Sequence, residues 1–97
     1  MMKELNPTIT CHDGFSMSVQ GSEYNYSTPR EDNPPYGYTH VECGFPSSTP
    51  VTSALLDYAE CGGNTEYTKA VYPYTPVEVV RAELDAHGGI ATGCLPS

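Results

Sequence analysis

The chain has 97 residues, which is the size of one domain with one hydrophobic core. Apolar residues make up 38% of the chain and charged residues 16%, a composition that excludes a disordered tail. Twelve Asp and Glu against four Lys and Arg give a formal net charge of −8, which repels nucleic acid and anionic membranes. We therefore expect no direct binding to nucleic acid and no membrane association.

Two alternating segments near the N-terminus predict a β-hairpin. Residues 1–13 are expected to form a lead-in that ends in a turn at Asp13 and Gly14. Apolar and polar residues then alternate with a period of two over 15–20 and again over 23–28, as is typical of half-buried strands. The short break between these segments favours a hairpin.

A proline-rich loop and a third strand follow. Residues 29–35 contain three prolines and three charged residues, a composition that cannot continue a central strand and predicts an exposed loop. The alternation returns over 36–45 and predicts a third strand. Tyr36, Tyr38 and Glu42 share one side of that strand, which we expect to be its outer face.

A first helix is predicted from its two ends. Thr49 suits the N-cap, and Pro50 suits the first helical position because its missing N–H costs nothing there. An apolar stripe at helical spacing runs from Val51 to Ala59, and the glycine pair at 62–63 ends the helix.

A fourth strand and a second helix complete the pattern. Residues 66–74 predict a strand that is bent or finished near its end by a proline. Thr75 suits the N-cap of the next helix, Pro76 its first position, and Glu78 a capping box. The helix is expected to stop near His87, just before two glycines.

These elements together predict an α+β fold. We expect an antiparallel sheet of three to four strands with two helices packed on one face. The whole chain, 1–97, is expected to form a single domain, with 1–13 as a lead-in and 91–97 as a tail.

The N-terminal segment and the cysteines indicate the compartment. The first residues contain no apolar signal region, and no run approaches the roughly 20 apolar residues that span a bilayer. We therefore expect a cytoplasmic protein, in the host cytoplasm if a phage encodes it. Four cysteines without a CxxC spacing argue against a zinc ribbon and favour thiols, and their even number leaves a disulfide open.

No combination of residues predicts an enzyme. Cys11, His12 and Asp13 are the residue types of a thiol site, but sequence neighbours on an extended chain point to opposite sides. The nucleophile-elbow, zinc-protease, phosphate-loop and dinucleotide motifs are absent. We expect no catalytic residues, no cofactor and no bound metal. A small metal-binding or redox protein that gathers distant cysteines and histidines stays an alternative.

Carboxylates and tyrosines are the remaining candidates for function. Acidic residues are spread along the chain, and most, Glu83 among them, are expected on outer faces or loops. A small acidic scaffold can occupy a Lys/Arg groove that is built for phosphate, and tyrosines beside the carboxylates add contact area typical of interfaces. The residues expected to contact a partner are Glu31, Asp32, Glu42, Asp57, Glu60, Tyr36 and Tyr38.

Several short stretches resemble small proteins of phages and mobile elements, some of which are anti-CRISPR inhibitors. These stretches are 15–20, 26–30, 44–47, 57–60, 74–80 and 87–90. The resemblance implies a protein inhibitor that binds a type I CRISPR–Cas surveillance complex, with the DNA-mimic kind of anti-CRISPR as the closest in size and charge. It implies no role for any single residue. The alternative of a different class is a phage structural or assembly accessory protein that binds through an apolar patch.

Overall fold

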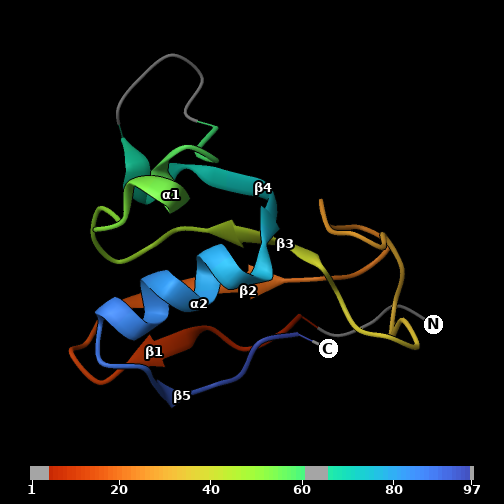
Figure 1. The fold of residues 1–97 in the computed structure, drawn as a ribbon, viewed down its shortest axis with the longest axis horizontal. Coiled ribbons are helices and arrows are strands. Elements are labelled where there is room, and N and C mark those ends of the chain that lie inside the picture. Colours follow the sequence, from red (N-terminus) through yellow and green to blue (C-terminus); the bar gives the residue numbers. More distant parts are fainter. Residues whose placement is uncertain (1–4, 61–65, 97) are drawn as a thin grey trace.

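The computed structural model describes residues 5–60 and 66–96, which fold around one five-stranded antiparallel sheet (Figure 1). Across the sheet the strands follow the order β4-β3-β2-β1-β5, and every neighbouring pair is antiparallel. The strands are β1 (Ile9–Cys11), β2 (Ser16–Gln20), β3 (His40–Gly44), β4 (Val71–Pro76) and β5 (Ile90–Thr92). The helices are α1 (Ser53–Leu56), the short 3₁₀ helix η1 (Tyr67–Lys69) and α2 (Val77–Ala86). The predicted α+β class with an antiparallel sheet is confirmed, whereas the predicted count of three to four strands is wrong.

The core lies between the sheet and α2. Alternation along β2 and β3 buries Met17, Val19 and Val41 completely, while polar residues between them stay partly exposed. Figure 1 shows α2 crossing one face of the sheet, and its Val80 and Leu84 complete the core on that side. Each such side chain contributes about 1.5–3 kcal/mol relative to leaving it in water. The helix α1 packs against α2.

Two short strands extend the sheet beyond the prediction. β1 lies within the expected lead-in, and β5 overlaps the expected tail. β1 pairs with β2 through Ile9 and Met17, and Ile9 is fully buried. β5 pairs with β1 through Thr92 and Thr10. Three residues contain less than two repeats of an alternating pattern, so neither strand is visible in the sequence alone.

The strand predicted over 23–28 is wrong, because these residues belong to a long loop. Among residues 5–60 and 66–96 their one ladder contact is an isolated bridge between Thr28 and His40. Side chains satisfy backbone groups that a strand would pair: the Tyr24 N–H donates to the Ser22 hydroxyl at 3.0 Å, and the Glu23 N–H donates to the Asp32 carboxylate at 3.1 Å. Such local hydrogen bonds offer the backbone an alternative to a sheet ladder.

Both helices differ from the prediction at their N-termini. The first is a single turn, and its N-cap is Thr52 rather than Thr49. The second begins at Val77, one residue later than predicted, with Pro76 rather than Thr75 at the N-cap position, and no side chain caps it. Thr75 cannot serve as that cap because it is a buried residue of β4, where its hydroxyl donates to the Tyr72 carbonyl. The predicted end of the second helix near His87 is confirmed.

Candidate functional site

The most distinctive surface element is the 21–39 loop, which connects β2 to β3 (Figure 1). Ordinary connections rarely exceed about 12–15 residues unless they bind something or are disordered. The 21–39 loop extends away from the sheet at the end opposite α1 in Figure 1. Its conformation is fixed by contacts to the strand residues Glu42 and Tyr74 and by Tyr38 within the loop.

Glu42 of β3 anchors the first half of the loop. One of its carboxylate oxygens accepts a hydrogen bond from the Asn25 side-chain amide at 3.0 Å, and the other accepts from the Tyr26 N–H at 3.1 Å. The Tyr26 carbonyl in turn accepts from the Tyr74 N–H of β4 at 2.9 Å. The Glu42 carboxylate, which the sequence predicted to contact a partner, therefore binds within the molecule and orients the loop.

Tyr38 closes the base of the loop and is buried, with only 9% of its surface exposed. Its ring covers Gly21, where an added Cβ would lie 2.8 Å from ring atoms. Its hydroxyl donates to the Glu31 carbonyl at 2.7 Å. The prediction that Tyr38 lies on an outer face is wrong, because the alternation of 36–45 does not continue as a strand before His40.

Three tyrosines of the loop face solvent. Tyr24 and Tyr26 are exposed, and Tyr36 is 99% exposed. The Tyr26 ring lies 5.7 Å from the ring of Tyr74 and 5.2 Å from the Arg30 guanidinium carbon, which rests over its face. Tyrosine presents a large rigid contact area at low entropic cost, so exposed tyrosines in one place are typical of binding surfaces.

Carboxylates accompany these tyrosines on the same loop. Glu23 and Glu31 are exposed, and Asp32 is half-buried because one of its oxygens accepts from the Glu23 N–H at 3.1 Å. That bond brings two acidic residues, distant in the loop, next to each other. The exposed positions of Glu31 and Tyr36 agree with the prediction.

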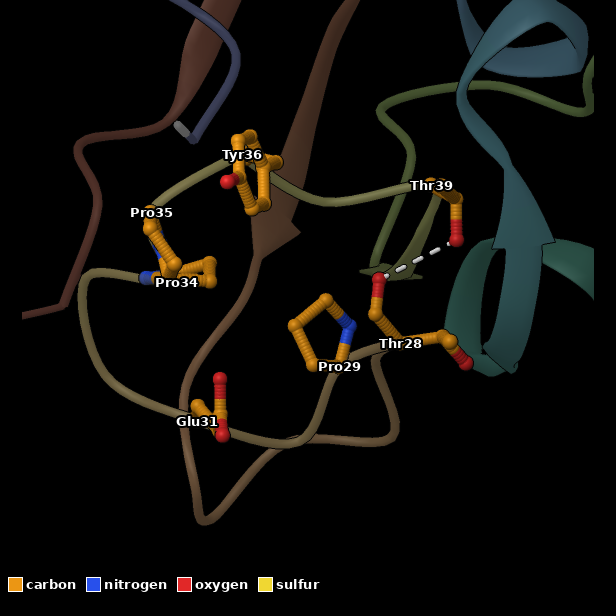
Figure 2. A pocket seen from close by; sticks show the side chains of 8 residues that line it. Thr28, Pro29, Glu31, Pro34, Pro35, Tyr36 and Thr39 are labelled. Carbon is orange, nitrogen blue, oxygen red and sulfur yellow. Dashed lines mark hydrogen bonds between the residues drawn. The ribbon is translucent and has the colours of Figure 1, made fainter.

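A pocket of about 310 Å³ opens beside Tyr36 (Figure 2). Proline rings and the tyrosine ring form most of its wall, and Glu31 supplies its one carboxylate. The lining residues are Thr28, Pro29, Glu31, Pro34, Pro35, Tyr36, Gly37 and Thr39. In Figure 2 the hydroxyl of Thr39 bonds to the carbonyl of Thr28, at 3.3 Å, on the side nearest the sheet.

Asp57 and Glu60 do not join this surface. Asp57 caps the C-terminal end of α1, and Glu60 bridges to Val71, the first residue of β4. Val71 pairs with Gly44, the last residue of β3, whereas the 21–39 loop meets the first residue of β3. Two of the predicted contact residues therefore lie at the opposite end of β3 from Glu31.

A second cluster of ionisable groups lies at the C-terminal end of α2, where His87 and Glu83 are buried and Asp13 is exposed. His87 lies between two carboxylates: its Nδ1 is 2.7 Å from an oxygen of Asp13, and its Nε2 is 2.7 Å from an oxygen of Glu83. Phe15 stacks on the imidazole with the ring centroids 3.8 Å apart. We call Asp13, Phe15, Glu83 and His87 the His87 cluster.

Glu83 is the most buried member of the His87 cluster, with no exposed surface. Its carboxylate accepts from the backbone N–H groups of Val51 and Thr52, both at 2.9 Å, and from the Thr52 hydroxyl at 2.6 Å. The prediction that Glu83 faces outward is wrong. Burial raises the pKa of Glu83, but these hydrogen bonds and the contact with His87 outweigh burial and hold it below its usual range.

The two carboxylates also set the charge of His87. Burial lowers the pKa of His87, but its hydrogen bonds to Asp13 and Glu83 and their charges raise it above its usual value. The pKa of Asp13 is lowered, first by the Phe15 N–H that donates to it and then by His87. The favoured state is thus an imidazolium between two carboxylates.

The His87 cluster is structural in its chemistry. Both ring nitrogens of His87 are engaged by carboxylates, so neither is free to take a proton from a substrate. Cys11 is buried and its pKa is raised, mainly by burial, while the adjacent His12 is exposed. Only the spacing of Glu83 and His87, one turn apart on a helix, signals this cluster in the sequence. Asp13 reaches His87 only through the tertiary fold, so the sequence does not indicate that it belongs to the cluster.

Within residues 5–60 and 66–96 no group of three His, Cys, Asp or Glu side chains is arranged to hold a metal ion. Cys11, Cys43 and Cys94 are free thiols, and Cys61 lies outside the described residues. No helix in that part of the chain has the length and apolar character needed to cross a bilayer.

Comparison with known proteins identifies no similar protein. No protein-family model matches the chain, and no curated protein and no solved structure is significantly similar to it.

Proposed function

We propose that the protein is an inhibitor that binds a basic surface of another protein through the exposed acids and tyrosines of the 21–39 loop. The observation that carries this proposal is their concentration on one long, anchored loop. Glu23, Glu31, Tyr24 and Tyr36 are all exposed there. The side chains of Glu42 and Tyr38 hold the loop in place through hydrogen bonds.

Acids and tyrosines contribute to binding in different ways. Carboxylates steer a basic partner over distances of about a Debye length, roughly 8–10 Å in physiological salt. Tyrosines act only at contact, where they bury apolar area and keep a hydroxyl for hydrogen bonding. A loop whose shape is fixed before binding loses less entropy when the complex forms.

The proposed partner is a protein groove that is lined with Lys and Arg and normally receives nucleic acid. The net charge of −8 favours such a groove and opposes nucleic acid itself. The type I CRISPR–Cas surveillance complex is the member of this class that the sequence resemblance suggests. In this proposal the mimicry of DNA is limited to the 21–39 loop, because Asp57 and Glu60 lie at the other end of β3.

Affinity capture from a lysate that contains a type I CRISPR–Cas system tests the proposal. Wild-type protein is compared with a loop variant, Glu23→Gln/Glu31→Gln, and with a matched variant, Asp57→Asn/Glu60→Gln, which removes the same charge from exposed positions at the far end. We expect the wild type and the far-end variant to capture a basic nucleic-acid-binding protein at low salt, and the loop variant to lose it. Addition of DNA should compete with capture. Equal losses in both variants, or capture unaffected by DNA, would contradict the proposal.

A further inference from the structure

The pocket beside Tyr36 indicates which kind of side chain the partner protein presents, an inference that rests on the proposed function. Tyr36, Pro34 and Pro35 stand on one side of the pocket, and Pro29 and Glu31 stand across from them (Figure 2). The walls are therefore ring carbons, with one carboxylate at the rim. An aromatic face and a carboxylate around the same space both attract a cation and repel an anion.

No cation of the chain itself fills this space in the described structure. The ion pairs among residues 5–60 and 66–96 are Lys69–Glu66, His87–Asp13 and His87–Glu83, and Glu31 is in none of them. Arg30, the neighbour of Glu31, directs its guanidinium over Tyr26 and does not line the pocket. The charge of Glu31 is therefore uncompensated and faces the solvent at the rim of the pocket.

We propose that this pocket receives an arginine side chain of the partner protein. A guanidinium is flat, can stack on the Tyr36 ring, and can donate two parallel hydrogen bonds to the Glu31 carboxylate. It is also more weakly hydrated than an ammonium group, so it loses less on entering a space walled by proline and tyrosine. The contact between Arg30 and Tyr26 is an example of the same pairing on this loop.

The test is an NMR titration of the intact protein with three blocked amino acids: N-acetylarginine methylamide, the corresponding lysine compound and the corresponding citrulline compound. Citrulline keeps the shape of arginine and lacks its charge. We expect saturable shifts confined to residues 28–39 for arginine, several-fold weaker binding for lysine, and no saturation for citrulline. The affinity for arginine should fall as salt is added.

Substitutions locate the binding site. Glu31→Gln should weaken arginine binding about threefold to fivefold, which is the upper part of the range expected for one exposed ion pair. Tyr36→Ala should abolish it, whereas Tyr36→Phe, which keeps the ring, should retain most of it. Tyr24→Ala, an exposed tyrosine of the same loop outside the pocket, should bind as the wild type does.

The outcomes separate the two proposals. Citrulline or lysine binding as tightly as arginine, or shifts outside 28–39, would overturn the arginine pocket. If the lysate partner is captured through Glu23 and Glu31 but blocked arginine does not bind, the pocket inference fails and the proposed function stands. If arginine binds in the pocket but capture is indifferent to the loop charges, the proposed function fails.

Discussion

A single imidazole joins three parts of the fold. His87 follows α2, Asp13 lies in the turn between β1 and β2, and Glu83 holds the two backbone N–H groups that precede α1. Glu83 has no exposed surface, so its charge is tolerated only because hydrogen-bond donors surround it. Removing one partner from such a pair leaves the other buried and unpaired.

Glu83→Gln should therefore destabilise the protein strongly. The amide keeps the shape of the carboxylate but turns one acceptor into a donor that faces N–H groups and the imidazolium. We expect the free energy of unfolding to fall by about 3 kcal/mol, as measured by urea denaturation. Glu78→Gln, on the exposed side of the first turn of α2, is the matched control and should change it by less than about 1 kcal/mol. Equal effects of both substitutions would contradict a structural role for the His87 cluster.

The stability should also depend on pH through His87. Because its pKa in the folded protein is raised above the usual 6.5, folding favours the protonated form, and this contribution is complete below pH 6.5. It is lost as the pH rises through the raised pKa. Asp13 and Glu83 have lowered pKa values, so their contribution is complete above pH about 4.5 and is lost in more acidic solution. We predict maximal stability between pH about 4.5 and 6.5.

Urea denaturation across pH 5–9 measures this profile, and NMR titration of the His87 ring measures its pKa directly. In His87→Gln the decline above pH 6.5 should be much reduced. Stability that rises between pH 6.5 and 8, or a His87 pKa below 6.5, would contradict the prediction.

At the scale of elements, the 21–39 loop depends on a close contact at its base. Gly21 is buried under the ring of Tyr38, which is itself held by the bond from its hydroxyl to the Glu31 carbonyl. The ring cannot move away without releasing the segment that carries Glu31. The position of the exposed loop therefore depends on the absence of a side chain at Gly21.

Gly21→Ala should destabilise the fold and loosen the loop. The new Cβ would lie 2.8–2.9 Å from three atoms of the Tyr38 ring, and we expect a cost of about 1–3 kcal/mol in urea denaturation. Amide hydrogen exchange should rise over residues 31–38. In a Tyr38→Leu background the same substitution should cost less than about 0.5 kcal/mol, because the clash is gone. If Gly21→Ala cost as much in the Tyr38→Leu background as in the wild type, the destabilisation would not come from the contact with the Tyr38 ring.

The elements show which sequence signals are reliable. Residues 15–20 and the second half of 36–45 became β2 and β3 because their apolar residues alternate and fill the core. Residues 23–28 alternate as well, but their Ser and Asn side chains bond to nearby polar groups, and the segment became loop. The capping signal at Thr75 placed the start of α2 one residue too early and for the wrong reason, because Thr75 is a core residue of β4 and Pro76 precedes the first helical residue.

At the scale of the whole molecule, the acidic residues are divided between distinct roles. Glu83 and Glu42 hold the structure together, Glu23 and Glu31 lie on the 21–39 loop, and Glu60 lies beyond the far end of β3. The proline-rich composition of 29–35 was sufficient to predict that Glu31 is exposed. The separation of Glu60 from Glu31 was not predictable, since it follows from the register between β3 and β4.

The salt dependence of binding to the purified partner tests the central claim most directly. Dissociation constants are measured over a range of salt concentrations for the wild type, Glu23→Gln/Glu31→Gln and Asp57→Asn/Glu60→Gln, the last two having equal net charge. We expect the loop variant to bind about tenfold more weakly at low salt with a shallower salt dependence, and the far-end variant to stay within about twofold of the wild type. Identical salt dependence for the two variants would contradict it, because binding would then follow the total charge and not the 21–39 loop.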